Sequence, residues 1–141
     1  MTAYKQQVGG SHYKGMKVQP LEFGYLNQYD GAIYSAIKYV SRHRAKDGKE
    51  GLKKARHCVL FRLEMVQRYG AVYGVERMPM THYISENEIA GLDATVLLRL
   101  NEWGMAPRNS NVDDHEHPAC ANLIVALIDT LISETYPEDS Q

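Results

Sequence analysis

The sequence lacks the features of secreted and membrane-embedded proteins. It has two cysteines in 141 residues, too few for a disulfide-built scaffold, and each lies in a helical pattern where a small core residue is expected. No apolar run approaches the ~18 residues that suggest a membrane span, and the first residues lack the apolar core of a signal peptide. We therefore expect a cytoplasmic protein without a membrane partner.

The sequence also lacks a P-loop, although a glycine-rich stretch invites one. Residues 8–20 read V-G-G-S-H-Y-K-G-M-K-V-Q-P, and Gly10 and Gly15 have the spacing of the first two glycines of G-x-x-x-x-G-K-[ST]. Met and Lys (16–17) stand where that motif needs Lys and Ser or Thr. Residues 1–8 are too polar and too short for the buried strand that must precede it. The stretch is therefore an irregular arm.

Strand alternation is missing too, and apolar residues recur at helical spacing instead. We expect a short helix from Pro20 that carries Leu21, Tyr25 and Leu26. A helix over 31–45 follows, with Asp30 as N-cap and an apolar stripe of Ile33, Ala36, Ile37 and Val40. After a turn at 46–51, a long helix runs from Leu52 to a cap at Gly70; another is opened by a Ser85–Glu88 capping box and stops near Gly104, and a last helix runs from Pro118 to before Pro137. Residues 71–84 have no helical period and are expected to be extended. We predict an all-α bundle of four to five helices with a glycine-rich N-terminal arm. A three-residue echo, S-H-Y (11–13) and T-H-Y (81–83), is too short to indicate a repeat.

The two halves of the chain carry opposite charges, although the net charge is −1. Residues 1–70 contain 13 Lys and Arg against 5 Asp and Glu, and residues 71–141 contain 3 against 12. We therefore distinguish a basic part (1–70) from an acidic helical part (71–141) of one globular unit. The halves either attract each other, within a subunit or in a homo-oligomer, or the basic half meets a nucleotide or another polyanion.

Cations of the basic half gather on the polar faces of two expected helices. These faces carry Ser35, Lys38, Tyr39 and Arg42 on the first helix, and Lys53, Lys54, His57 and Arg68 on the second. Such faces are usually only solvated. Residues 38–56, however, hold eight Lys and Arg against two acids, so they cannot pair within the segment. A phosphate would supply the missing negative charge.

Four short motifs follow one another along the basic half: S-H-Y-K (11–14), Q-P-L-E-F (19–23), A-I-K-Y-V-S-R-H-R-A-K (36–46) and G-L-K-K-A-R-H (51–57). In this order they resemble the core of a family of small bacteriophage nucleotide kinases that phosphorylate dTMP and dGMP and have no Walker motif. The resemblance covers roughly residues 9–66. It implies a nucleotide-handling protein of the host cytoplasm that transfers phosphate to a deoxynucleoside monophosphate.

The resemblance also implies which residues act. It marks Ser11, His12, Tyr13, Pro20, Lys38, Tyr39, Arg42, Lys46, Lys53, Lys54 and Ala55. We expect His12, Lys38 and Arg42 to be catalytic. We expect substrate contacts from Ser11, Tyr13, Ser35, Tyr39, Lys46, Lys53, Lys54 and His57. The phosphate donor would be a nucleoside triphosphate, with Mg²⁺ left open. The chain departs from the family at Ser35, where Asn is usual, and at Gly51, where Asp is usual.

Two other functions compete with this one. An all-α nucleoside triphosphate pyrophosphohydrolase would hold magnesium with E-x-x-E and E-x-x-D pairs, and the nearest approaches here, Glu86 with Glu88 and Glu88 with Asp93, have the wrong spacing. A non-catalytic module could bind nucleotide or nucleic acid through the basic half, where Tyr34, Tyr39 and Phe61 interleave with cations. We consider nucleic acid the less fitting ligand because the acidic half would repel it.

The segment D-D-H-E-H (113–117) brings acids and histidines together in a polar loop before Pro118. His115 and His117 would be loop ligands at best, and the spacing fixes no third ligand. We expect a solvated or capping role there and predict no metal site.

Overall fold

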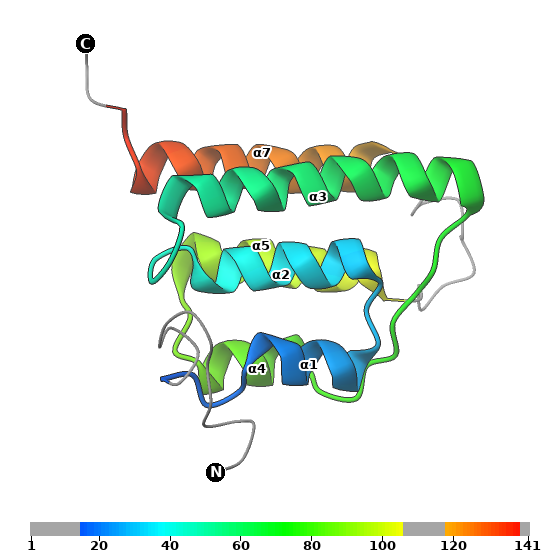
Figure 1. Cartoon of the computed structure of the whole chain (residues 1–141), viewed down its shortest axis with the longest axis horizontal. Helices are drawn as coiled ribbons and strands as arrows, with labels where there is room; N and C mark the ends of the chain where they lie inside the picture. The colour runs from blue at the N-terminus through cyan, green and yellow to red at the C-terminus, as the bar shows by residue number, and fades with distance from the viewer. Residues whose placement is uncertain (1–14, 106–117, 139–141) are drawn as a thin grey trace.

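The computed structural model describes residues 15–105 and 118–138, and all of its regular structure is helical. The described helices are α1 (Pro20–Asn27), α2 (Gly31–Arg42), α3 (Gly48–Tyr69), α4 (Met80–Glu86), α5 (Gly91–Gly104) and α7 (Pro118–Thr135). They form three layers, with α3 and α7 in one, α2 and α5 in the middle, and α1 and α4 in the third (Figure 1). The all-α prediction is confirmed, with six helices in the described ranges in place of the expected four to five.

Local sequence signals explain where the first three helices begin and end. Pro20 occupies the first turn of α1, where its missing N–H costs nothing. The carboxylate of Asp30 accepts hydrogen bonds from the backbone N–H groups of Ala32 and Ile33 and so caps α2. Gly70, with φ of +84°, ends α3 as predicted.

Three expectations about elements are wrong. The stretch 71–84 is not extended throughout, because α4 begins at Met80. Ser85 and Glu88 do not open a helix; Ser85 lies in the last turn of α4 and Glu88 follows it with φ of +54°. The turn expected at 46–51 lies at 43–47, because α2 ends at Arg42 and not at 45, and α3 begins at Gly48.

The core lies between the layers and is built from the expected apolar stripes. Ile33, Ala36, Ile37 and Val40 of α2 are all buried. Of the stripe expected on α3 (Leu52, Ala55, Val59, Leu63, Val66), all but the partly buried Leu63 are buried. In α1 the burial differs from the expectation. Leu21 and Tyr25 are exposed, whereas Phe23 is buried and stacks on Tyr83 of α4, with ring centroids 4.3 Å apart. This aromatic pair therefore joins α1 to α4 within their layer.

The two halves repeat one arrangement, α1–α2–α3 and α4–α5–α7. Asn27, at the end of α1, donates from Nδ2 to the carbonyl of Met78 and accepts from its N–H, both at 2.8 Å. Asn87, 60 positions after Asn27, donates from Nδ2 to the carbonyl of Val18 at 2.8 Å and accepts from its N–H at 3.0 Å. Val18 in turn lies 60 positions before Met78. Reciprocal contacts of this kind are those of a twofold relation. We call the pair the asparagine clasps.

The repeat extends through the middle and outer layers. The buried residues of α2 (Ile33, Ala36, Ile37, Val40) lie 60 positions before those of α5 (Asp93, Val96, Leu97, Leu100). Those of α3 (Leu52, Ala55, Val59, Arg62) lie 69 positions before those of α7 (Ala121, Ile124, Ile128, Leu131). The described helices of residues 15–69 and of residues 80–135 thus form two similar three-helix units packed against each other.

Ion pairs join the basic half to the acidic half. Arg44 pairs with Asp93, Lys49 with Glu138 and Arg56 with Asp129, at 2.9 to 3.0 Å, and Lys17 lies 4.0 Å from Glu86. The interpretation that the halves attract each other within one subunit therefore accounts for part of the charge asymmetry.

The last helix is unusually apolar for its position. By length and composition alone α7 could cross a membrane, and 28% of it is buried in the fold. Helices in the core of water-soluble bundles pass the same test, and α7 packs on α3 and α5. The absence of a membrane partner therefore stays a prediction.

Candidate functional site

Three cations surround the ring of Tyr39 on the surface formed by α2 and α3. Nζ of Lys38 lies 4.9 Å from the ring centroid, Cζ of Arg42 lies 5.0 Å from it, and Nζ of Lys54 lies 5.7 Å from it. We call these four residues the Tyr39 cluster. Each distance is within the ~6 Å at which the negative face of an aromatic ring attracts a cation. The ring therefore offsets some of the repulsion between the three charges.

Helix geometry and a tight turn bring the cluster together. Lys38 and Arg42 are four residues apart on α2, so they share one face, and their side of the helix is half-buried. The connection to α3 reverses the chain at Asp47 and Gly48, whose φ values are +71° and +54°. Gly48 adopts this left-handed conformation without strain. The short turn lays the first turns of α3 beside α2 and carries Lys54 to the ring.

The cluster carries more positive charge than its surroundings neutralise. Arg42 pairs with Asp47 at 3.1 Å. In the part of the chain that the structure describes, no carboxylate lies within ion-pair distance of Lys38 or Lys54. Partial burial, and then the charges of Arg42 and Lys54, lower the pKa of Lys38 from its ordinary value. A lowered lysine pKa means that the fold holds this cation at a cost, which an anionic ligand would relieve.

Lys53 and His57, also expected at the phosphate, lie elsewhere. They line a groove of about 800 Å³ between the first turns of α3 and the end of α7. We call it the α3–α7 groove. Adjacent positions on a helix point about 100° apart, so Lys53 and Lys54 face different surfaces. Of the two lysines expected to face a phosphate held by Lys38 and Arg42, Lys54 is therefore the one that lies with them, and Lys53 lies in the groove. Their contacts with a substrate stay a prediction.

The other predicted residues are placed as follows. Ser35 is half-buried on α2, and Lys46 is exposed in the turn before α3. Ser11, His12 and Tyr13 lie outside the described residues, as do His115 and His117. Arg68, on the cationic face of α3, pairs with Glu64 at 3.3 Å near the far end of the helix. Of the residues predicted for the site, the structure brings together Lys38, Tyr39, Arg42 and Lys54.

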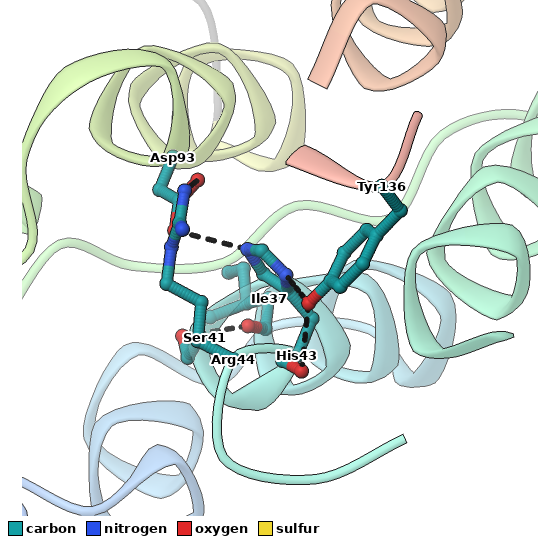
Figure 2. Close-up of polar contacts among 6 residues, drawn as sticks. All are labelled: Ile37, Ser41, His43, Arg44, Asp93 and Tyr136. Carbon is teal, nitrogen blue, oxygen red and sulfur yellow. Dashed lines mark hydrogen bonds and ion pairs between the residues drawn. The ribbon is translucent and has the colours of Figure 1, made fainter. Parts of the chain in front are cut away.

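A buried network at His43 escaped the sequence analysis. His43, only 1% exposed, lies between Asp93 and Tyr136, with its Nε2 3.0 Å from a carboxylate oxygen of Asp93 and its Nδ1 2.9 Å from the Tyr136 hydroxyl (Figure 2). Arg44 donates to both oxygens of the same carboxylate, at 2.9 and 3.2 Å. The Tyr136 hydroxyl also donates to the His43 carbonyl. The network ties the end of α2 to α5 and to the residue after α7.

The electrostatics of Asp93 follow from this network. Burial alone would raise the pKa of Asp93, but hydrogen bonds from His43 and Arg44 outweigh burial and lower it. The carboxylate is therefore ionised and fully engaged. A signal existed in the sequence, since His43 lies beside the apolar stripe of α2 three residues after Val40, but its partners are 50 and 93 positions away.

Gly51, where the resembled kinase family usually has Asp, lies against the side chain of Asp47. A Cβ added to Gly51 would lie 3.2 Å from Cβ of Asp47, closer than nearly all such contacts. The Asp47 side chain therefore uses the room that a side chain at position 51 would need. Asp47 is the carboxylate that pairs with a member of the Tyr39 cluster.

The second unit has different side chains where the first has its cations. The positions equivalent to Tyr39, Arg42 and Lys54 are Arg99, Glu102 and Leu123, which line a pocket of about 190 Å³. Arg99 and Glu102 pair with each other at 3.2 Å. The shared arrangement therefore presents a cationic surface in the first unit and a neutral one in the second.

Among the described residues, no group of three or more His, Cys, Asp and Glu is placed to hold a metal ion. Mg²⁺ that arrives with a nucleotide is commonly held by one or two carboxylates and by the phosphates themselves. Asp47 is the carboxylate beside the Tyr39 cluster that could take that part.

Comparison with known proteins locates a family-like region. A family described as a protein of unknown function, DUF3310, matches residues 8–59. The match runs from the glycine-rich arm to the middle of α3 and contains the whole Tyr39 cluster. No curated protein and no solved structure matches the chain. The matched part therefore overlaps most of the first unit, and the family description names no activity.

Proposed function

We propose that the chain binds deoxynucleoside phosphates and transfers a phosphoryl group from a nucleoside triphosphate to a deoxynucleoside monophosphate. The observation that carries the proposal is the Tyr39 cluster, in which three cations converge with one paired carboxylate between them. Convergent cations without enough acids are suited to a phosphate, whose charge and oxygens complete the set. The resemblance to phage nucleotide kinases rests on residues of the same cluster.

Phosphoryl transfer of this kind does not require a covalent intermediate with the protein. Phosphoryl transfer depends on holding donor and acceptor in line and on stabilising the charge spread over the equatorial oxygens. The Arg42 guanidinium can bind two phosphate oxygens as a fork, and the two lysines act as point charges. His12 and Tyr13, carried by the arm, would contact the base or a phosphate. Asp47 would accept Mg²⁺ if the donor brings one.

The pyrophosphohydrolase alternative finds less support in the described part of the chain. Its mechanism needs several carboxylates on facing helices. Asp93 is engaged by His43 and Arg44, and Glu88 lies in the connection between α4 and α5. We therefore favour transfer over hydrolysis. That the protein acts as a homo-oligomer in the cytoplasm, without nucleic acid, stays a prediction.

The test is a transfer assay with the full chain. The four common deoxynucleoside monophosphates are each incubated with ATP and Mg²⁺, and diphosphate products are separated by ion-exchange chromatography. We expect product with at least one monophosphate and a loss of about 100-fold or more in kcat/KM for Arg42→Ala, because charge-assisted hydrogen bonds contribute about 1.5–3 kcal/mol each and a fork makes two.

The matched control is Arg68→Gln, which removes a cation from α3 away from the cluster. It should keep the wild-type rate. The proposal is wrong if no monophosphate is phosphorylated, or if Arg42→Ala and Arg68→Gln have equal rates.

A further inference from the structure

The α3–α7 groove has the composition of a second nucleotide site. One wall, from α3, carries Lys49, Lys53, Arg56 and His57, and apolar surface comes from Leu60 and Ile132. Its volume of about 800 Å³ is in the range of ligand sites, which bury an apolar moiety and fix it with a few polar groups. A base and a polyphosphate need this combination of surfaces.

A carboxylate already occupies the cationic wall. Glu138, beyond the end of α7, accepts a hydrogen bond from Nζ of Lys49 at 3.0 Å, although its side chain is 84% exposed. The Lys49 hydrogen bond, with a smaller effect of the Lys53 charge, lowers the pKa of Glu138. Exposed ion pairs contribute little, because water screens both charges. A ligand phosphate could therefore displace this carboxylate at little cost.

We infer that the α3–α7 groove binds the nucleoside triphosphate, with its phosphates against Lys49 and Lys53 where the Glu138 carboxylate now lies. The inference rests on the proposed function, because a kinase needs a place for its donor as well as for its acceptor. The groove has three lysines and arginines, as many as the Tyr39 cluster, and two of them, Lys49 and Arg56, pair with Glu138 and Asp129. Its volume of about 800 Å³ gives room for the larger nucleotide, whose phosphates would replace these carboxylates as partners of the cations. The acceptor monophosphate then lies at the Tyr39 cluster.

The two places are neighbours on one helix. Lys53 faces the groove and Lys54 faces Tyr39, so in-line transfer requires the triphosphate chain to extend from the groove across the first turns of α3 to the Tyr39 cluster. In the transfer, the bond from the γ-phosphorus to the β,γ-bridging oxygen breaks, and a bond forms from that phosphorus to a phosphate oxygen of the monophosphate. The electron pair stays on the β-phosphate oxygen, and two diphosphates leave.

The experiment measures binding of each ligand separately by calorimetry. The probes are the non-hydrolysable triphosphate β,γ-imido-ATP and the monophosphate that the transfer assay selects, or dTMP if it selects none. Lys53→Ala should weaken the affinity for the triphosphate about tenfold and change the affinity for the monophosphate less than twofold. Lys54→Ala should do the reverse. Glu138→Gln should tighten the triphosphate several-fold because it removes the competing carboxylate. Arg68→Gln should change neither ligand.

The outcomes separate the inference from the proposed function. If Lys53→Ala and Lys49→Ala both leave triphosphate binding unchanged while Lys54→Ala weakens the monophosphate, the groove is not the donor site and the proposed function stands. If neither probe binds the wild type, both fall. Lys53 is exposed, so its replacement should leave the unfolding midpoint unchanged, and a shifted midpoint would be checked against Lys49→Ala.

Discussion

The two three-helix units share their architecture but not their surfaces. Each has a clasping asparagine, a left-handed residue after it, and a middle helix that begins with glycine, Gly31 in one unit and Gly91 in the other. The first unit places Tyr39, Arg42 and Lys54 where the second has Arg99, Glu102 and Leu123. The two units thus share the positions that pack in the core, whereas their surface residues differ and give each unit a different surface charge.

Cations of the first unit divide according to what they face. Arg44, Lys49 and Arg56 pair with carboxylates of the acidic half, and Lys49 and Arg56 also line the α3–α7 groove. Lys38 and Lys54 face away from the second unit, and in the described residues they have an aromatic ring as their partner. The charge asymmetry therefore serves two purposes, holding the units together and leaving a cationic surface for a ligand.

The largest effect should come from removing the carboxylate that joins the units. Asp93→Ala leaves the buried His43 and the Arg44 guanidinium without their acceptor. Hydrogen bonds to a charged group contribute about 1.5–3 kcal/mol each, and Asp93 accepts from both His43 and Arg44, so we expect a loss of about 3 kcal/mol or more in the free energy of unfolding. Urea denaturation measures it. A loss below about 1 kcal/mol would show that the network is not the link described here.

The same carboxylate predicts the direction of acid sensitivity. The folded pKa of Asp93 is lower than its ordinary value of 3.8. Its contribution is therefore fully present above about pH 4 and is lost as the pH falls through the lowered pKa. Wild type and Asp93→Asn should converge in stability in this acidic window. Parallel curves down to pH 2 would contradict the assignment.

The asparagine clasps should differ in strength although their geometry is alike. Asn27 is fully buried and Asn87 only partly, so Asn27→Ala leaves backbone groups without access to water. We expect a loss of about 3 kcal/mol in unfolding free energy for Asn27→Ala and about 1 kcal/mol for Asn87→Ala. Thermal unfolding of both variants checks this, and equal losses would mean that burial does not decide the cost.

The equivalent positions Lys54 and Leu123 give the sharpest functional contrast. Lys54→Ala should weaken monophosphate binding about tenfold, equal to about 1.4 kcal/mol, because it removes one cation from the phosphate. Leu123→Ala, at the equivalent position in the second unit, should leave the affinity unchanged. If both variants bind like wild type, the Tyr39 cluster is not the acceptor site.

The smallest effect concerns the stability of the free protein. Lys38→Met should raise the free energy of unfolding by less than about 1 kcal/mol, because Lys38 is only partly buried and water screens its charge. The folded pKa of Lys38 is lowered, so its charge opposes folding below that pKa, and the penalty fades as the pH rises toward 10.5. The difference between variant and wild type should therefore shrink at alkaline pH. An unchanged or lower free energy of unfolding at pH 7 would contradict the charge imbalance.

The predictable parts of the fold were those with a long apolar period or a local capping signal. α2, α3 and α7 have both, and each forms near the residues where it was expected. α4 was missed because it has only seven residues and buries only Met80 and Tyr83 among them. So short a segment shows no period, and its burial depends on α1 and α5, which the local sequence does not reveal.

The repeat was hidden for a related reason. The echo S-H-Y and T-H-Y suggests a spacing of 70, whereas the clasps and the middle helices are 60 positions apart. The asparagine and glycine are retained at both N-x-x-x-G sites, 27–31 and 87–91, but most core positions keep only their apolar character. The cations of the site were found from charge density and helical spacing. The sequence did not predict that these cations divide between two surfaces, because this depends on where α7 packs.

A crystal structure of the protein with the preferred deoxynucleoside monophosphate tests the central claim most directly. The account predicts the phosphate within hydrogen-bonding distance of Arg42 and at least one of Lys38 and Lys54, beside the Tyr39 ring. A bound monophosphate whose phosphate lies in the second unit, or away from all three cations, would contradict it.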